Sequence, residues 1–291
     1  MSLSIQIVDP KNFPLWDQML LQTPGGSFFH SSAWARVLSE SYGYIPMYFA
    51  VMEGDRFRAL VPVMEVNSFL TGKRGVSLPF TDYCEPIIEE GIEFQDLLNP
   101  IIDHGKKSGW KYVELRGAAQ YLSGKPCSTA YYGHILDLSA GHEKIFSIFR
   151  DSTRRNVKKA EKEKVEVRIE DTAEAMGAFC RLNCLTRREH GLPPQPRHFV
   201  TKLHREVISK KNGFVALAYH QGKAIAGGLY FHYGRQGVFK YGASDKRYQS
   251  LRAGNLVMWE AIKQFCREGF KSLFFGRTEP ENDGLRQFKR G

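Results

Sequence analysis

The sequence predicts a two-domain α/β protein in which one structural unit occurs twice. Three observations support this prediction: the length, the composition and a repeated order of strand and helix patterns. At 291 residues the chain exceeds what a single hydrophobic core usually organises, so two domains of about 150 residues are expected. Hydrophobic residues make up 42% and charged residues 25% of the chain, which indicates a globular protein and excludes a disordered or fibrous one.

The clearest sign of duplication is a glycine-led strand that occurs twice, as GWKYVELRG at residues 109–117 and as GFKSLFFGR at residues 269–277. Each copy follows an amphipathic segment with helical periodicity. Further upstream, residues 47–66 and 213–233 both contain two apolar strands joined by a turn that carries a glycine. Each half is therefore predicted to contain a hairpin, a third strand, a helix and a further strand, in that order.

The predicted domain boundary follows the strand YYGHILDLS, where Ser139, Ala140 and Gly141 interrupt the pattern. We therefore expect an N-terminal domain over residues 1–140 and a C-terminal domain over residues 141–291. Any active site is expected in the C-terminal domain.

Several classes of protein do not fit the sequence. No apolar run approaches the roughly 20 residues needed to span a bilayer, and the N-terminus lacks the regions of a signal peptide, so a cytoplasmic location is expected. The five cysteines are scattered, which predicts neither a disulfide framework nor a metal site. Cys180 and Cys184 would lie one turn apart on a helix and are expected to be buried. The formal net charge of +10 implies an anionic partner, which leaves nucleic acid, a membrane surface and a phosphate-bearing molecule open.

Basic residues are concentrated in one segment at the middle of the chain. The members are Arg150, Arg154, Arg155, Lys158, Lys159, Lys162 and Lys164. Arg154, Arg155 and Lys158 could contact phosphate oxygens, although an ordinary solvated helix face explains the pattern equally well. No aromatic residue lies between Arg150 and Arg168, so stacking on nucleic-acid bases is not supported.

Two further segments could hold functional side chains. In TRREHGLPPQP, His190 follows Glu189 at a helix end and could act as a general base, but such exposed pairs are more often plain surface. In VFKYGASDKRYQSLRAGN, a strand leads through a basic loop to a helix, and the free amides of a helix N-terminus favour an anion. A simple strand-to-helix turn remains the alternative. The candidate cofactor-binding residues of this loop are Arg247, Arg252, Gly254 and Asn255.

The last candidate is the terminal pair Phe288 and Lys289. A positioned lysine can stabilise the oxyanion of a tetrahedral intermediate in acyl transfer, whereas a lysine near a chain end is commonly only solvated. No Ser/His/Asp order, metal-ligand cluster or Walker loop is evident elsewhere in the sequence.

Together these segments resemble the FemABX family, the peptidoglycan interpeptide-bridge aminoacyltransferases. The resemblance spans nearly the whole chain and is carried by S-x-x-W in HSSAWARV, the RRNVKKAEK helix, TRREHGLPPQP, YGAS, and FGR followed by G-x-x-x-FK. It implies an α/β (α+β) fold of two tandem GNAT-like domains, similar to acyl-CoA N-acyltransferases, each with a mixed central sheet flanked by helices.

The resemblance also implies an enzyme, a transferase that moves an activated acyl or aminoacyl group to an amine of a cell-envelope precursor of the peptidoglycan type. Lys289 and Phe288 match the family's terminal FK, which implies a catalytic role in which the lysine stabilises the reacting carbonyl. The implied substrate-binding residues are Arg188, Tyr241, Arg277, Arg154, Arg155 and Trp34. The implied partners are a phosphate-bearing small-molecule or lipid-linked precursor, tRNA, and a membrane surface in peripheral contact.

No tightly bound cofactor is expected, and aminoacyl-tRNA or acyl-coenzyme A would be the donor. The Q/R-x-x-G-x-G/A run with which GNAT enzymes grip coenzyme A is incomplete here. The family often carries a phosphate-binding lysine four residues after the tryptophan, where this chain has Leu38 with Arg36 nearby. The relatives continue beyond FKRG, so a short C-terminal tail is expected to be missing. A coenzyme A-dependent N-acyltransferase and a non-catalytic module for RNA or an anionic glycan remain alternative functions.

Overall fold

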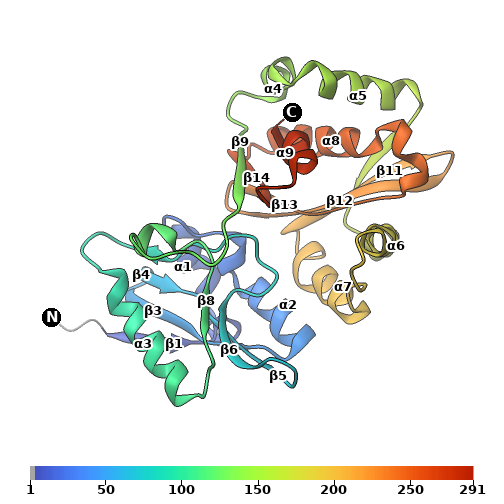
Figure 1. The fold of residues 1–291 in the computed structure, drawn as a ribbon. Coiled ribbons are helices and arrows are strands. Elements are labelled where there is room, and N and C mark those ends of the chain that lie inside the picture. Colours follow the sequence, from blue (N-terminus) through green and yellow to red (C-terminus); the bar gives the residue numbers. More distant parts are fainter. Residues whose placement is uncertain (1–3, 291) are drawn as a thin grey trace. The chain divides into compact units, whose positions relative to one another are not determined.

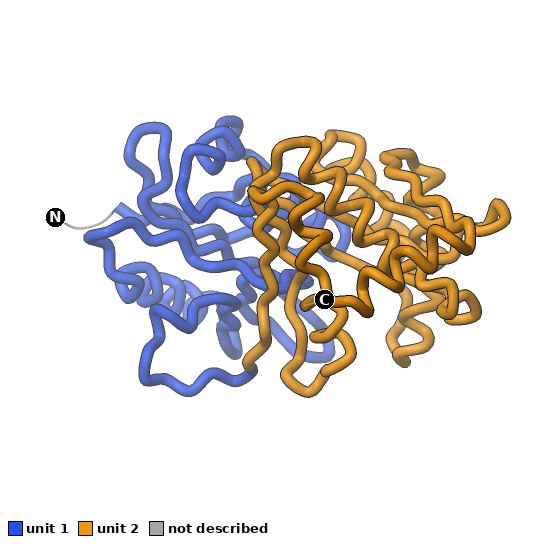
Figure 2. The backbone as a smooth tube through the Cα atoms, turned by 90° about the horizontal axis from the view of Figure 1, so that it is seen from above, with its two compact units in different colours: residues 1–129 blue, residues 130–291 orange. Residues whose placement is uncertain are grey.

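The computed structural model describes residues 4–290, which form two compact units (Figures 1 and 2). The units comprise residues 1–129 and residues 130–291, so the division falls before the boundary that the sequence predicts between residues 140 and 141. The reason is strand β9 (Tyr132–Asp137), which pairs with β14 (Ser272–Thr278) in the sheet of the C-terminal unit. The strand expected to close the first domain therefore belongs to the second.

The N-terminal unit contains two four-stranded sheets, with strand orders β1-β3-β4-β7 and β2-β5-β6-β8. The strands of the first sheet are β1 (Ile5–Val8), β3 (Tyr48–Glu53), β4 (Arg56–Val61) and β7 (Ile87–Ile88). The strands of the second are β2 (Ile45–Pro46), β5 (Met64–Ser68), β6 (Gly72–Ser77) and β8 (Val113–Leu115). The helices are α1 (Trp16–Gln22), α2 (Ser32–Tyr42) and α3 (Phe94–Lys107).

The C-terminal unit contains one six-stranded sheet in the order β10-β11-β12-β13-β14-β9. Its other strands are β10 (Glu166–Glu170), β11 (Gly213–His220), β12 (Lys223–Tyr233) and β13 (Gln236–Ser244). Its helices are α4 (His142–Ile148), α5 (Asp151–Lys162), α6 (Ala173–Glu189), α7 (Arg197–Leu203), α8 (Ala253–Arg267) and α9 (Asp283–Arg290). Helices α4, α5 and α8 cover one face of the sheet, and α6 and α7 cover the other (Figure 1).

The predicted order of elements occurs in both units. Hairpins β3–β4 and β11–β12 are antiparallel, and each unit later places a helix before a strand that runs parallel to an earlier one. In the N-terminal unit this helix is α3 and the parallel pair is β6 with β8; in the C-terminal unit they are α8 and β13 with β14. The copies differ because the stretch that corresponds to β12 is divided in the N-terminal unit into β4, which pairs with β3, and β5, which pairs with β6.

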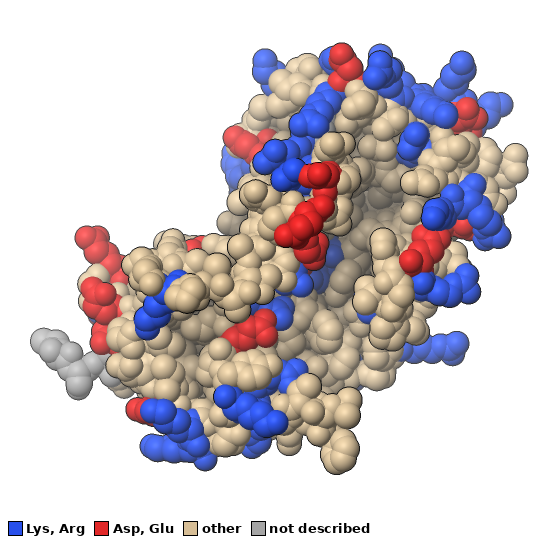
Figure 3. Space-filling model, in the orientation of Figure 1, with Lys and Arg blue, Asp and Glu red and all other residues tan. Residues whose placement is uncertain are grey.

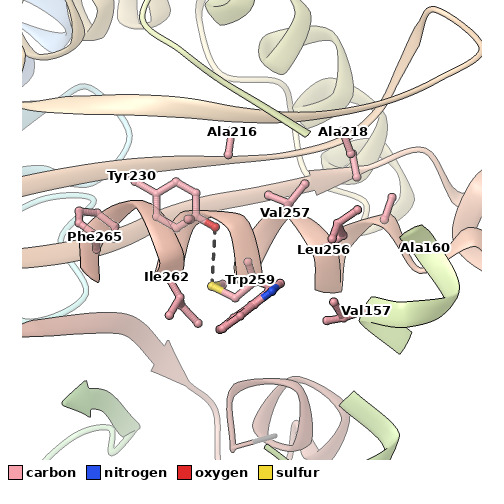
Figure 4. Packing of buried hydrophobic residues seen from close by; sticks show 14 of the residues in the cluster. Val157, Ala160, Ala216, Ala218, Tyr230, Leu256, Val257, Trp259, Ile262 and Phe265 are labelled. Atoms are coloured by element: carbon pink, nitrogen blue, oxygen red, sulfur yellow. Dashed lines mark hydrogen bonds between the residues drawn. The ribbon is translucent and has the colours of Figure 1, made fainter. Parts of the chain in front are cut away.

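Helix α8 carries the largest apolar stripe of the C-terminal unit. Trp259, Ile262 and Phe265 recur every three residues and therefore lie on one side of the helix, where they join the main core (Figure 4). On the sheet side, Tyr230 packs against Phe265 and its hydroxyl donates to Met258 Sδ at 3.6 Å. This packing fixes α8 against the sheet, and with it the start of the helix at Ala253.

Replacing Phe265, which has no exposed surface, is expected to destabilise the protein strongly. Phe265→Ala should lower the free energy of unfolding by about 3–5 kcal/mol, because the removed ring leaves a cavity that the surrounding core only partly fills. Urea unfolding of the full chain measures the change. The exposed Arg267→Ala in the same helix serves as the control and should stay within about 0.5 kcal/mol of the parent; equal effects of both changes would contradict the packing described.

Candidate functional site

The candidate site lies where the terminal helix α9 meets strand β14. Lys289 on α9 is half-buried, and its Nζ donates a hydrogen bond of 2.7 Å to the backbone carbonyl of Arg277 on β14. The neighbouring Phe288 packs against the main core of the unit. The predicted catalytic pair is therefore held in place by the fold, whereas an ordinary terminal lysine would extend into solvent.

A pocket of about 130 Å³ opens beside this helix. It is lined mainly by apolar side chains together with a few polar ones: Leu136, Ile148, Phe149, Thr153, Asn255, Met258, Trp259, Ile262, Phe275, Phe288, Lys289 and Arg290. An apolar pocket with a few convergent polar groups is the usual form of a small-molecule site. It brings together Phe288 and Lys289 with Asn255, a residue that the sequence predicts to bind an anion at the start of α8.

Strand β14 is irregular at this point. Its parallel pairing with β13 ends at Val238 and Phe274, although β13 continues to Ser244. Its antiparallel pairing with β9 shifts register between Phe274 and Arg277, which leaves two β14 residues opposite one residue of β9. Such a bulge bends a strand and redirects its backbone groups, and here the Arg277 carbonyl accepts the hydrogen bond from Lys289.

The β9 residue opposite the bulge is His134, because Ile135 pairs with Phe274 and Gly133 pairs with Arg277. Side chains two residues apart on a strand point to the same face, so His134 shares a face with Leu136, which lines the pocket. Its Nε2 atom is buried and has no hydrogen-bond partner among the described residues. Sequence reasoning missed this histidine, although a polar residue within the apolar strand YYGHILDLS was a signal.

Burial lowers the pKa of His134 below its ordinary value of 6.5, and the positive charges of Lys289, Arg290 and Arg286 lower it further. The imidazole is therefore neutral at neutral pH, and a neutral imidazole has one nitrogen that can accept a proton. All three cations belong to α9, so the same helix that presents the lysine keeps the histidine uncharged.

The basic segment forms helix α5 and adjoins the pocket through Thr153. Figure 3 shows Lys and Arg side chains gathered over the part of the surface formed by α4 and α5. Arg154 donates to the Ser147 carbonyl at 3.2 Å and forms an ion pair with Asp151, whereas Arg155 is exposed. An anionic substrate reaching the pocket would therefore meet positive charge at the start of α5.

The two motifs TRREHG and YGAS come together at the ends of α6 and β13. The hydroxyl of Thr186 donates to the Ser244 carbonyl at 3.1 Å and accepts from the Ser244 amide at 3.0 Å. Arg188 is exposed at the end of α6. Tyr241 is half-buried, with Lys240 Nζ 4.9 Å from the centre of its ring. None of these residues lines the pocket.

Part of the positive charge in the loop before α8 is neutralised by an ion pair. Arg247 donates from Nε and Nη2 to the two carboxylate oxygens of Asp245, at 2.9 and 2.6 Å. These hydrogen bonds hold the pKa of Asp245 below its usual range. Arg252 and Gly254 are exposed at the start of α8. Of the four residues predicted for this loop, Asn255 is the one that lines the pocket.

The remaining predicted residues lie elsewhere. The guanidinium of Arg277 lies 4.3 Å from the ring centre of Tyr131, at the edge of the same sheet. Trp34 belongs to the N-terminal unit, has no exposed surface and donates from its indole to Thr81 Oγ1 at 2.9 Å. Its side chain packs the core, so the proposed site does not include it.

Within residues 4–290, no group of three or more His, Cys, Asp or Glu side chains is arranged to hold a metal ion. Cys180 and Cys184, expected to be buried, are partly exposed on α6. None of the helices in the same range combines the length and apolar character that crossing a bilayer requires.

Comparison with known proteins identifies the architecture. Residues 147–290 match the family described as "Acetyltransferase (GNAT) domain". The chain has a tandem GNAT fold. The whole structure is similar to that of FemX, with a TM-score of 0.72 and 12% identity over 99% of this chain and 93% of FemX. It is also similar to a tandem GNAT protein from the clavulanic acid biosynthesis pathway, with a TM-score of 0.57 and 9% identity over 97% and 92% of the two chains.

A third similar structure is L-PGS from Bacillus licheniformis, with a TM-score of 0.56 and 12% identity over 96% of this chain and 83% of that one. No curated protein sequence matches this tandem GNAT chain. The predicted fold class is confirmed, and so is the resemblance to FemABX proteins at the level of the fold. The family match lies in the C-terminal half, where the sequence predicts any active site.

The proximity of Lys289 and His134 can be measured directly. Lys289→Met should raise the pKa of His134 towards 6.5, because it removes one of the positive charges that disfavour the imidazolium. A titration of the His134 ring protons by NMR gives the value. Lys271→Met, which removes an exposed lysine from the same unit, should leave the curve unchanged. An unaltered pKa in the Lys289 variant would contradict the placement of α9 over β9.

Proposed function

We propose that this protein is an acyltransferase that moves an activated acyl or aminoacyl group to an amine of a cell-envelope precursor. The observation that carries the proposal is the position of Lys289, anchored by the Arg277 carbonyl at the edge of an apolar pocket within the GNAT domain. The tandem fold shared with FemX supports the same choice of reaction.

In this reaction the amine nitrogen attacks the carbonyl carbon of the donor, and a C–N bond forms. The bond from that carbon to the leaving oxygen of an aminoacyl ester, or to the leaving sulfur of a thioester, breaks. The Lys289 ammonium stabilises the negative charge that develops on the carbonyl oxygen. Its hydrogen bond to Arg277 fixes its position before the substrate arrives, and a preorganised donor stabilises a transition state without further reorganisation.

The attacking amine must lose a proton as the amide forms. His134 is the group that we assign to receive it and to pass it to the leaving oxygen or sulfur, since its neutral ring shares the pocket face of β9 and lies near Lys289. An activated ester makes modest demands on a general base, because the carbonyl already reacts readily with an amine held in place. A single neutral imidazole suffices for this chemistry, and no catalytic triad is needed.

The donor is proposed from charge and position. The basic surface of α5 next to Thr153 suits a polyanionic donor such as aminoacyl-tRNA and a phosphate-bearing or lipid-linked acceptor. The protein would encounter this donor and this acceptor in the cytoplasm or at the cytoplasmic face of the membrane. The second candidate is a coenzyme A-dependent N-acyltransferase, which the GNAT family match and the position of Asn255 at the start of α8 favour.

A transfer assay tests the reaction and separates the donors. Purified protein is offered aminoacyl-tRNA or acyl-coenzyme A with a UDP-linked or lipid-linked muropeptide, and amide formation is followed by mass spectrometry. Lys289→Met should lower kcat/KM by about 10²–10³-fold, the usual effect of losing one oxyanion donor, while substrate binding measured by calorimetry is kept. Lys271→Met is the control.

Turnover with acyl-coenzyme A alone would favour the second candidate. RNA or glycan binding that is unaffected in Lys289→Met, without turnover of any donor, would contradict the proposed enzyme and favour a binding module.

The role of His134 has its own signature in the pH profile. Because the imidazole must be neutral to accept a proton, kcat/KM should fall as the pH drops through the His134 pKa, below 6.5. His134→Gln should lower the rate by about 10²–10⁴-fold and remove that inflection. His190→Gln, a matched change at the exposed end of α6, should do neither. A rate and an inflection retained by the His134 variant would rule out the assignment.

A further inference from the structure

The hairpin β5–β6 of the N-terminal unit ends in two fully exposed apolar side chains. Phe69 is 104% and Leu70 is 88% exposed, the highest values among the exposed large hydrophobic residues. They occupy the turn between Ser68 and Gly72, which are themselves the last paired residues of the two strands. Figure 1 shows the hairpin at the periphery of the unit. Two adjacent apolar side chains are therefore surrounded by solvent.

The strands at the base of this hairpin are firmly paired, so the fold holds the tip in its exposed position. Five consecutive residue pairs join the strands, from Met64 with Val76 to Ser68 with Gly72. On the sheet behind them, the Trp110 indole donates to Glu65 at 2.6 Å. Strand β6 is also paired with β8 on its other side. The paired strands keep the apolar tip exposed. Because the hairpin is already ordered, its binding to a partner would cost little conformational entropy.

Basic side chains surround the turn. Lys73 and Arg74 follow it directly on β6, and the side chain of Lys111 lies so close that a methyl group added at Gly72 would come within 2.6 Å of its Cε atom. Arg74 is hydrogen bonded to the Thr71 hydroxyl within the turn. Lys73 is paired with Glu65 at 3.3 Å, which reduces its charge, whereas Arg74 and Lys111 add positive charge around the apolar tip.

We propose that this hairpin tip inserts into an anionic lipid bilayer, with Phe69 and Leu70 in the acyl region and Arg74 and Lys111 at the headgroups. An apolar tip with a basic collar matches the two layers of such a surface, since the headgroup region attracts cations and the interior accepts apolar groups. A protein partner is a poorer match, because specific interfaces bury about 800 Å² on each side and a two-residue tip offers far less. The proposal does not depend on the transfer reaction.

Vesicle cosedimentation with the full chain tests this proposal. Binding is compared on vesicles of phosphatidylcholine alone and of phosphatidylcholine with phosphatidylglycerol in equal parts. Wild-type protein should partition to the anionic vesicles and be released by salt. Phe69→Ser with Leu70→Ser should weaken this partitioning on the order of 100-fold, from the loss of two buried apolar side chains. Arg74→Gln with Lys111→Gln should weaken binding to the anionic vesicles selectively.

The matched control is Leu15→Ser with Leu21→Ser, which removes two other exposed leucines from the same unit and should leave binding unchanged. Circular dichroism melting checks that both double variants are folded. Three results would overturn the proposal: no binding of the wild type, undiminished binding of the tip variant, or self-association of the wild type that the tip variant abolishes. The second would move the membrane contact to another basic surface such as α5, and the third would make the tip a contact between copies.

Discussion

The hydrogen bond from Lys289 to the Arg277 carbonyl joins α9 to β14, and the candidate site depends on it. Helix α9 has eight residues and no fully buried side chain, and isolated helices of this length are unstable in water. The lysine contact and the packing of Phe288 therefore have to hold the helix on the sheet. If α9 moved away, the pocket would lose three of its lining residues and the cations that lower the pKa of His134.

The irregular course of β14 explains why the acceptor of this bond is available. In a regular sheet the Arg277 carbonyl would pair with a neighbouring strand, because buried backbone groups are nearly always hydrogen bonded. Here the pairing with β13 ends at Phe274, and the bulge opposite His134 displaces the pairing with β9. Gly276 has a positive φ of +75°, a backbone conformation that residues with a side chain rarely adopt, and this glycine therefore permits the bulge. Gly276 thus permits the bulge that lies next to the Arg277 acceptor and opposite His134.

The sequence was sufficient for the order of elements, because apolar periodicity and glycine-bearing turns are local and occur in both copies. It was insufficient for β9, since the alternation in YYGHILDLS specifies a strand without specifying the sheet that the strand joins.

The terminal lysine could be predicted from a motif, whereas His134 could not. The charges that lower the pKa of His134 come from α9, which follows it by more than a hundred residues in the sequence. Arg247 was expected to face an anionic ligand, and its pairing with Asp245 two residues away shows that a nearby carboxylate can satisfy such a charge first. Trp34 was expected to contact substrate, but its burial could not be read from a single tryptophan in a helix.

The two units share similar elements but carry different surface features. In the C-terminal unit β12 connects to β13 through a short turn, and that unit contains the lysine, the pocket and the basic helix. In the N-terminal unit β5 and β6 form the corresponding hairpin, and its turn carries Phe69 and Leu70. An exposed apolar pair is unfavourable in water and gains nothing for the core, because neither side chain packs against the protein. A bilayer offers an apolar interior for the tip and negative charge for the basic residues around it. This is why we assign the β5–β6 hairpin to the membrane and the chemistry to the other copy.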